Sequence, residues 1–363
     1  MTASTLGADV AIADRMTDFI APLRLCLDGE ALLSNWRWLK ARGGSATCGA
    51  AVKANGYGLG AVEVVRRLAD AGCRDFFVSN WAEARPLEPL LGEGLSLSVL
   101  HGVRDEDMGV ALQSRARPVL CTPVQMARWK AAGGGRCDVM VDTGMNRLGL
   151  DWQDDVAAQI RGLQVDTLLS HLASADEDVA LTQVQLDRFR TLRREVPAVR
   201  YSLANSAGIC LGTDYAFDLT RPGLALYGGI PREEAEGAIR QVVFPQAQIV
   251  QRRLVRAGDT IGYNATHLAA QDMEIAILNL GYADGYLRGF SGRGRVSLGA
   301  LSLPVIGRVS MDMIAVDVST CPESAEGDWL DIDYALPSAA AISGLSQYEL
   351  LTGLGARFDR MWC

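Results

Sequence analysis

The chain has 363 residues and a mass of 39.0 kDa, more than one typical domain, and this size allows a large barrel with a smaller second domain. Hydrophobic residues make up 49% of the chain and charged residues 21%, which excludes a disordered or fibrous protein. The formal net charge of −8 provides no overall attraction for nucleic acid or an anionic membrane.

Residues 1–19 contain no basic stretch followed by an apolar run, and nowhere does the chain reach the length of about 18 apolar residues that a membrane span requires. We therefore expect a cytoplasmic protein. The 8 cysteines stand singly without a CxxC pair, and the 3 histidines are widely separated. This pattern predicts reduced core cysteines and argues against a zinc or iron site, so we expect no metal.

A strand-like segment at residues 22–32 comes first in the chain. Between about residues 47 and 230, short apolar runs, loops with Gly or Asn, and amphipathic stretches such as 61–72 and 176–196 follow one another. The apolar runs lie at residues 47–52, 75–79, 95–102, 117–122, 137–144, 165–172, 200–206 and 218–228. Such repeated strand–helix units are typical of a (β/α)₈ barrel. An open doubly wound sheet is the alternative, but no GxGxxG follows the first strand.

Beyond residue 242 the pattern changes to short strands broken by Gly and Asp, and a helical period returns only near the carboxyl terminus. We therefore predict an α/β fold with a (β/α)₈ barrel over residues 33–241 and a mostly β domain over residues 242–363. The segment 22–32 is expected to be a strand that pairs with this second sheet and ties the two ends of the chain together.

Polar residues follow the predicted barrel strands at their carboxyl ends, where barrels of this class carry catalytic groups. They are Lys53, Asp142, Arg147, His171, Asn205, Ser206, Arg221 and Gly223. No metal cluster, Ser-His-Asp order or phosphate loop accompanies them. Cationic and hydroxyl groups in this arrangement suit an anionic, phosphate-bearing aldehyde cofactor.

Lys53 follows three apolar residues and precedes Asn55, Gly56 and Tyr57 rather than a run of charges. A Schiff base needs a desolvated, often neutral amine, and this position favours one. The alternative is an ordinary rim lysine whose ammonium group reaches water.

These segments resemble the alanine racemase family, the fold-type III pyridoxal 5′-phosphate enzymes. AVKANGYGLG is similar to the family's lysine segment, and VDTGMNRLG, SHLASADE, NSAG and RPGLALYG are similar to its fifth to eighth strand segments. IGYNATH, GYADGYLR, GRVSMDM and YELLTGLGARFDR are similar to its carboxy-terminal domain, in the same order. The resemblance covers nearly the whole chain. It implies a pyridoxal phosphate-dependent homodimer that interconverts L- and D-alanine and supplies D-alanine for peptidoglycan.

The resemblance also implies residue roles. Lys53 would hold the cofactor and act as one catalytic base, and Tyr263 would act as the second base from the other subunit. Arg221 would face the pyridine nitrogen, and His171 would pack near the ring. The phosphate would be held by Tyr57, Ser206, Gly223, Leu224 and Tyr348. The substrate carboxylate would be bound by Arg147 and the backbone of Met311. The entrance would be lined or supported by Asp176, Tyr282, Arg288, Arg308 and Asp312.

The chemistry explains these residue types. Racemisation removes the α-proton on one face and returns a proton on the other, so two bases on opposite faces are needed. A tyrosine with a pKa of about 10 is a poor base at neutral pH, and His171 and Arg221 nearby would favour its phenolate. An arginine at the ring nitrogen donates a hydrogen bond without giving up its proton, which should suppress transamination.

Each residue also has an ordinary structural alternative. Tyr263 is compatible with a half-buried strand aromatic, and His171 with a core histidine. Arg221 is compatible with a rim arginine paired with Asp218. Arg147 is compatible with a solvated rim charge, and the remaining tyrosines with packing aromatics. The order of the motifs favours the functional interpretation over these alternatives.

One position departs from the family pattern. Many members carry a carbamylated lysine two residues before the Asp of the DTG segment, where it orients the arginine, and this chain has Met140 there. Another group, a water or an anion must then orient Arg147. Three functional alternatives also remain open: a racemase of broader specificity acting on serine, lysine or another amino acid, a related decarboxylase, and a non-catalytic pyridoxal phosphate-binding protein.

Overall fold

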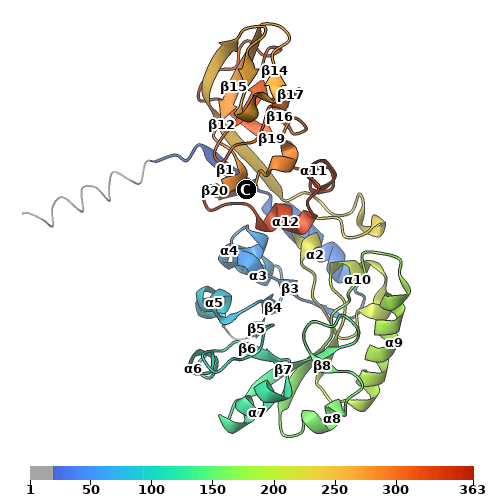
Figure 1. Ribbon diagram of the computed structural model, residues 1–363. Coiled ribbons are helices and arrows are strands. Elements are labelled where there is room, and N and C mark those ends of the chain that lie inside the picture. The colour runs from blue at the N-terminus through green and yellow to red at the C-terminus, as the bar shows by residue number, and fades with distance from the viewer. Residues whose placement is uncertain (1–18, 93) are drawn as a thin grey trace, which may run out of the picture. The chain divides into compact units, whose positions relative to one another are not determined.

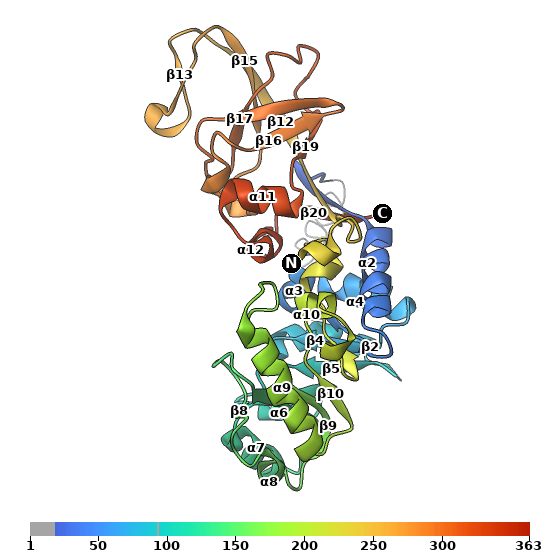
Figure 2. The same ribbon diagram turned by 90° about the vertical axis from the view of Figure 1, so that its right-hand side faces the viewer.

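The computed structural model describes residues 19–92 and 94–363. Residues 1–18, in which we expect no targeting segment, lie outside the described residues. Among the described residues, no helix has the length and apolarity needed to cross a membrane. The chain forms two compact units (Figures 1 and 2). One consists of Leu27–Val243, Tyr334–Gly353 and Trp362–Cys363, and the other of Phe244–Asp333, Leu354–Met361 and the described residues 19–26.

The first unit contains a curled sheet of parallel strands that are neighbours in chain order. These strands are β3 (Ala50–Ala51), β4 (Asp75–Val78), β5 (Ser96–Val99), β6 (Arg117–Leu120), β7 (Arg136–Asp142), β9 (Gln164–Leu169) and β10 (Arg200–Ser202). A further strand, β8 (Leu150–Asp151), pairs with β7.

The sheet closes through the last strand of the unit. β11 (Leu219–Thr220) pairs in parallel with β2 (Thr47–Cys48), and the N–H of Arg221 donates to the carbonyl of Ala204, beyond β10, at 2.9 Å. An apolar cluster fills the interior, formed by Phe77, Val119, Cys121, Met140, Leu169 and Leu219. The predicted (β/α)₈ barrel is therefore confirmed.

Helices and short helical turns connect these strands and lie outside them (Figure 1). They are α2 (Gly29–Arg42), α3 (Lys53–Tyr57), α4 (Ala61–Asp70), α5 (Trp81–Ala84), η2 (Arg85–Leu90), α6 (Met108–Ala111), α7 (Pro123–Ala131), α8 (Val156–Gln159), α9 (Ala180–Glu195), α10 (Ser206–Cys210), η3 (Thr213–Tyr215), η4 (Leu224–Tyr227) and η5 (Glu233–Ala235). Two later helices also belong to this unit, α11 (Leu336–Ser343) and α12 (Gln347–Thr352).

Local sequence explains why several of these helices begin where they do. Thr122 accepts the N–H of Gln125 and is followed by Pro123 at the first position of α7. Asn80 and Asn205 cap α5 and α10 in the same way. These polar caps place the end of each preceding strand and the start of each helix close together.

The strand predicted at residues 22–32 is shorter than expected. β1 (Leu23–Leu27) ends at Leu27, and α2 begins at Gly29 because Asp28 acts as its N-cap and accepts the N–H of Ala31 at 2.8 Å. The prediction was therefore wrong for residues 28–32. The expected pairing is confirmed, since β1 lies between β12 (Val243–Val255) and β20 (Asp359–Trp362).

The second unit is β-rich, as predicted. Its sheet has the order β15–β18–β17–β16–β19–β12–β1–β20, and β15 also pairs with β12, so part of the sheet closes on itself. The remaining strands are β13 (Thr260–Ile261), β14 (His267–Leu268), β15 (Met273–Leu278), β16 (Arg295–Leu298), β17 (Leu301–Ile306), β18 (Ile314–Asp317) and β19 (Trp329–Ile332). Short turns are η6 (Tyr263–Ala265), η7 (Tyr282–Asp284) and η8 (Arg288–Phe290). Val255, Ile275 and Ile306 are among its core residues.

Candidate active site

A cavity opens at the carboxyl ends of the barrel strands, the rim on which sequence analysis placed the polar residues. The predicted site residues that line it are Lys53, Tyr57, Arg147, His171, Ser206, Arg221, Gly223, Leu224 and Tyr348. Other lining residues were not singled out from the sequence: Phe77, Leu100, Met145, Leu148 and Ser170. The first four are apolar residues just at or beyond strand ends, so only their position along the predicted strands could have indicated them.

Lys53 begins a turn of unusual handedness. Ala54, Asn55, Gly56 and Tyr57 have φ values of 52°, 53°, 63° and 55°, so the chain makes a left-handed turn after the lysine. Residues with a Cβ atom rarely adopt this conformation. The turn is held by its surroundings: the Asn55 side chain accepts the N–H of Ala61 at 3.0 Å, and Gly56 donates to the carbonyl of Val52 at 2.8 Å.

The electrostatics of the cavity lower the affinity of its bases for protons. Burial, followed by the charges of Arg147 and Arg221, lowers the pKa of Lys53, although Glu83 acts in the opposite direction. Burial and the neighbouring cations also lower the pKa of His171 to about 3. His171 is therefore a neutral imidazole at physiological pH, and Lys53 is poised to lose its proton more readily than a solvated lysine.

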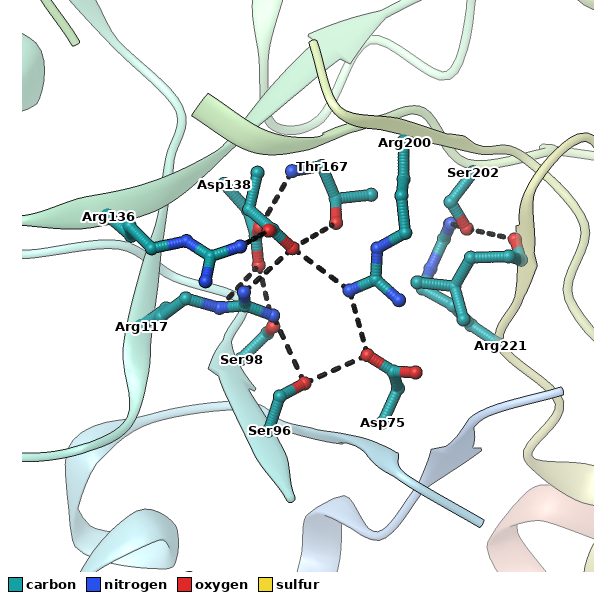
Figure 3. Close-up of polar contacts among 12 residues, drawn as sticks. Asp75, Ser96, Ser98, Arg117, Arg136, Asp138, Thr167, Arg200, Ser202 and Arg221 are labelled. Carbon is teal, nitrogen blue, oxygen red and sulfur yellow. Dashed lines mark hydrogen bonds and ion pairs between the residues drawn. The ribbon is translucent and has the colours of Figure 1, made fainter. Parts of the chain in front are cut away.

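Arg221 is buried at the inner end of the cavity. Its guanidinium donates to the carbonyl of Ser170 at 2.5 Å. It also donates to the hydroxyl of Ser202, whose side chain lies next to Arg221 in Figure 3. Among the described residues, no carboxylate forms an ion pair with Arg221. Asp218, the partner expected in the alternative interpretation, pairs instead with Arg193 at 3.4 Å. The alternative of a rim Arg221–Asp218 pair is therefore wrong. Burial lowers the pKa of Arg221 to about 10, which leaves it cationic.

Beside this arginine, the barrel interior contains a cluster of paired charged side chains (Figure 3). Asp166 pairs with Arg117 at 2.7 Å and with Arg200 at 2.9 Å, and it also contacts Arg136. Arg200 also pairs with Asp75 at 2.8 Å. Asp166 and Asp75 are therefore paired with these arginines rather than with a cationic group that lines the cavity.

The loop that carries Arg147 is organised by Asp142. Its carboxylate accepts the N–H groups of Gly144, Met145 and Arg147 at 2.7, 2.8 and 2.9 Å. Burial opposes ionisation, but these backbone donors hold the pKa of Asp142 below its usual range. Met140 lines the cavity nearby. In the described part of the chain, no carboxylate pairs with the Arg147 guanidinium, so this charge is available to an anionic ligand.

Hydroxyl groups occupy another side of the cavity. The Ser206 hydroxyl, at the start of α10, accepts the N–H of Gly223 at 2.9 Å and that of Ala225 at 3.2 Å. Gly223 is required by space, since a Cβ atom there would lie 2.1 Å from the Tyr57 hydroxyl oxygen. Partial burial and the charge of Asp176 raise the pKa of Tyr348, which places Asp176 near this side of the cavity.

The residues of the cavity fit pyridoxal phosphate by their chemistry. Lys53 supplies an amine of lowered pKa, and Arg147 and Arg221 supply positive charge. Asp142, the one carboxylate among the described lining residues, accepts several backbone N–H groups. Hydroxyls of Tyr57, Ser206 and Tyr348 add donors for a phosphate. An anionic aldehyde is thus better matched to this cavity than a cation or an apolar ligand.

The remaining predicted residues lie in the other compact unit and do not line this cavity. They are Tyr263, Tyr282, Arg288, Arg308, Met311 and Asp312. Tyr263 is 67% exposed and, with Arg308, lines a second cavity beside the sheet of that unit. The Arg288 guanidinium lies 5.5 Å from the centre of the Tyr282 ring.

The surroundings of Asp312 reveal a residue that sequence analysis missed. Arg357 pairs with Asp312 at 2.7 Å and with the buried carboxylate of Asp284 at 2.6 Å. It stands within the quoted segment YELLTGLGARFDR, but the segment alone does not show which acids it meets. Arg357 therefore links the segment of Met311 and Asp312 to the turn that follows Tyr282.

Comparison with known proteins places the chain among relatives of one kind. Residues 27–231 match the family model described as alanine racemase, N-terminal domain, and residues 242–362 match the one described as alanine racemase, C-terminal domain. The alanine racemase of Methylobacterium nodulans is 41% identical over 356 residues, covering 93% of this chain and 95% of that protein. The alanine racemase of Acidiphilium cryptum is 39% identical over 351 residues, covering 93% and 98%.

Solved structures show the same relationship. The alanine racemase of Bartonella henselae, described with covalently bound pyridoxal phosphate, matches with a TM-score of 0.87 and 32% identity. That match covers 95% of this chain and 100% of the other. The biosynthetic alanine racemase of Pseudomonas aeruginosa has a TM-score of 0.86 and 33% identity, with the same coverage of 95% and 100%.

Proposed function

Since the chain belongs to the alanine racemase family of isomerases, we propose that it interconverts L- and D-alanine with pyridoxal 5′-phosphate held in the barrel cavity. The observation that carries this proposal is the position of Lys53, an amine of lowered pKa that lines a cationic cavity. A lysine with these properties forms a Schiff base with an aldehyde far more readily than a solvated lysine does.

When bound, pyridoxal phosphate withdraws electrons from the amino acid and so acidifies the hydrogen on its Cα atom. The Lys53 Nζ atom takes up or returns this proton on one face, and the lowered pKa keeps a larger fraction of the amine unprotonated for this task. Arg221 would donate a hydrogen bond to the pyridine nitrogen and keep its own proton, since its pKa of about 10 lies above physiological pH. His171, which lines the cavity, is neutral and would lie beside the ring without adding charge.

The other cavity residues bind and orient. Hydroxyls of Tyr57, Ser206 and Tyr348, together with the backbone at Gly223 and Leu224, hold the phosphate. Arg147 binds the substrate carboxylate, since its guanidinium lines the cavity and forms no ion pair among the described residues. With a methionine at position 140, the Asp142-bound loop takes over part of the task of placing Arg147, because Asp142 fixes the Arg147 backbone.

Tyr263 supplies the second base from another copy of the chain. Two observations support a homodimer: the Tyr263 ring is 67% exposed, and Leu268 on the adjacent β14 is 62% exposed. Exposed apolar side chains beside a reactive residue are typical of a surface that a partner covers. The partner subunit's Tyr263 would stand across the cofactor from Lys53, with the backbone of the partner's Met311 at the substrate carboxylate. The entrance would be lined or supported by Asp176 and by the partner's Tyr282, the partner's Arg288, the partner's Arg308 and the partner's Asp312.

We also propose that the product D-alanine enters peptidoglycan and that the enzyme works in the cytoplasm. All eight cysteines are free thiols, and a reducing compartment favours that state.

An absorbance spectrum of the purified protein and a racemase assay over a panel of L-amino acids test the function. We expect a pyridoxal phosphate chromophore and fastest racemisation with alanine. Faster racemisation of serine or lysine than of alanine would instead indicate a racemase of broader specificity. A chromophore without any racemisation would favour a non-catalytic binding protein, and release of carbon dioxide would favour a decarboxylase.

A further inference from the structure

A carboxylate reaches the Lys53 turn from the neighbouring strand–helix unit. Glu83 lies in α5, just beyond β4. One oxygen of its carboxylate accepts the N–H of Ala54 at 2.9 Å, and the other accepts the N–H of Ser79 at 2.7 Å. Ala54 directly follows Lys53, and Ser79 directly follows β4. One side chain therefore joins two chain segments at the carboxyl ends of adjacent barrel strands.

This bridge differs from what a glutamate at this helix position usually does. Asn80 caps α5, and its side chain accepts the N–H of Glu83 at 3.0 Å. In a capping box, the carboxylate of the third helical residue returns to the N–H of the cap residue. Here the Glu83 oxygens instead bind the residue before the cap and the turn after Lys53. The Glu83 carboxylate therefore binds backbone groups next to Lys53 and β4 rather than the cap of its own helix.

Within the left-handed turn, the Ala54 N–H donates to a side chain, that of Glu83. The following donors Gly56, Gly58 and Gly60 bind the backbone carbonyls of Val52, Ala54 and Asn55 at 2.8 to 2.9 Å. Ala54 itself has a φ of 52°, an unfavourable value for a residue with a Cβ atom. A charged acceptor at the first donor of this turn stabilises the conformation that sets the direction of the Lys53 side chain.

Glu83 is also the negative member of the charges around the Lys53 amine. Arg147 and Arg221 favour loss of the proton from Lys53, whereas Glu83 favours the ammonium form. His171, which lines the same cavity, is neutral above a pH of about 3. Burial raises the pKa of Tyr57 and Tyr348, which therefore stay neutral, and the Asp142 carboxylate accepts backbone N–H groups. Removing the charge of Glu83 should therefore lower the pKa of Lys53 further.

We propose that Glu83 is a positioning residue for Lys53, which acts by tying Ala54 to Ser79 and so fixing the base of the reactive side chain at the cavity. This proposal rests on the proposed function, because it takes Lys53 as the reactive amine. Glu83 touches neither substrate nor cofactor in this proposal, and its effect is transmitted through the backbone of the turn and through its charge.

Glu83→Gln tests the proposal with little change of shape. The amide retains one acceptor oxygen, but its NH₂ group cannot accept the second N–H, so one of the two bridging bonds is lost. Glu88→Gln is the matched control. The Glu88 carboxylate also accepts two hydrogen bonds from a distant segment, the Arg115 N–H at 2.7 Å and the Ser114 hydroxyl at 2.6 Å. Neither residue belongs to the Lys53 turn.

The first measurement is the titration of Lys53 by carbon-13 NMR of the lysine side chains in the full chain freed of cofactor. Lys40, Lys53 and Lys130 are the lysines of the sequence, so the signals are readily assigned. We expect a lower titration midpoint for Lys53 in Glu83→Gln and the wild-type midpoint in Glu88→Gln. A folded Glu83→Gln protein with the wild-type Lys53 midpoint would overturn the proposal.

The second measurement is hydrogen exchange of the Ala54 and Ser79 amides in the same proteins. Losing a hydrogen bond to a charged acceptor should speed exchange of at least one of them by about tenfold or more. Glu83→Asp keeps the charge but is one methylene shorter, so it should also speed exchange while moving the Lys53 midpoint less. Unchanged exchange in both variants would refute the bridge. Neither measurement requires alanine or cofactor, so a failure of the proposed function would instead appear in the wild-type protein, as absence of racemisation.

Discussion

At the scale of single residues, the cavity combines one amine of lowered pKa with two guanidinium groups that have no carboxylate partner among the described residues. Such a site binds an anion and lets a lysine act as nucleophile and base. The chemistry therefore depends on Lys53 more than on any other side chain.

Borohydride reduction of the cofactor-loaded protein should fix pyridoxal phosphate to Lys53, because a lysine amine is the group that forms this linkage. Peptide mass spectrometry identifies the modified residue, with Lys40 and Lys130 as internal controls. Lys53→Ala should be colourless and inactive. Labelling of Lys40 or Lys130 instead of Lys53 would contradict the central assignment.

Tyr263→Phe should remove one of the two bases and leave the cofactor in place. Loss of a general base typically lowers the rate by a factor of about 100 to 10,000, so we expect the racemisation rate of Tyr263→Phe to decrease by such a factor. Exchange of the alanine α-hydrogen with deuterated water should then persist from one enantiomer. Tyr215→Phe, at a tyrosine outside the cavity, serves as the control. Equal residual exchange from both enantiomers would contradict the two-base assignment.

His171 should make the stability of the protein depend on pH. Its folded-state pKa of about 3 lies below the ordinary value of 6.5, so the unfolded chain binds more protons between these two values. The contribution of the neutral His171 to the free energy of unfolding is complete above pH 6.5 and is lost as the pH falls towards 3. In urea unfolding at pH 5 to 6.5, His171→Gln should reduce the slope of stability against pH by up to about 1.4 kcal/mol per unit. His267→Gln controls for removal of a histidine; an equal change of slope in both variants would argue against this role.

At the scale of secondary-structure elements, the left-handed turn after Lys53 controls where the reactive side chain begins. Gly56→Ala should destabilise the protein by about 1 to 2 kcal/mol, because Gly56 has a φ of 63° and an added Cβ would lie 3.1 Å from the backbone of Ala61. Urea unfolding measures the change. Gly109→Ala in α6 is the control, since nothing lies within 4 Å of its added Cβ. An equal loss of stability in both variants would show that the turn is not under this constraint.

The sequence predicted the barrel well because its strands are short apolar runs that recur between helical stretches, a pattern set by local composition. The start of α2 was missed because the alternating residues of β1 continue into Asp28, although Asp28 followed by Gly29 and Glu30 is a recognisable helix-start signal. The handedness of the Lys53 turn was not predictable from local sequence. Ala54, Asn55 and Tyr57 all carry side chains that ordinarily avoid it.

For the site residues, too, local position in the sequence was predictable and contacts between distant segments were not. Arg147 and Ser206 line the cavity as expected from their position, because the carboxyl end of a barrel strand predicts the rim. Glu83 was missed because its contact with Ala54 spans 29 residues, and no local pattern indicates such a contact. The charged cluster in the barrel interior was missed for a similar reason. Asp166 stands between Val165 and Thr167 in a strand, and its partners Arg117 and Arg200 come from other strands.

At the scale of the whole molecule, the two units carry different parts of the proposed machinery. The barrel unit holds the cationic cavity with Lys53, and the β-rich unit holds Tyr263 at an exposed position beside its own cavity. If the second base comes from a partner, every working site needs the barrel of one subunit and the β-rich unit of the other.

Mixed dimers test this arrangement directly. Lys53→Ala and Tyr263→Phe should each be inactive as homodimers, because every site then lacks one base. A hybrid dimer contains one site with both wild-type residues and one site with neither. Co-expression with two different affinity tags isolates the hybrid, which should have about half of the wild-type activity per dimer. Each variant purified alone with both tags serves as the control. A tagged hybrid that forms but has no activity would show that Tyr263 acts within its own chain, and the shared-site arrangement would then be wrong.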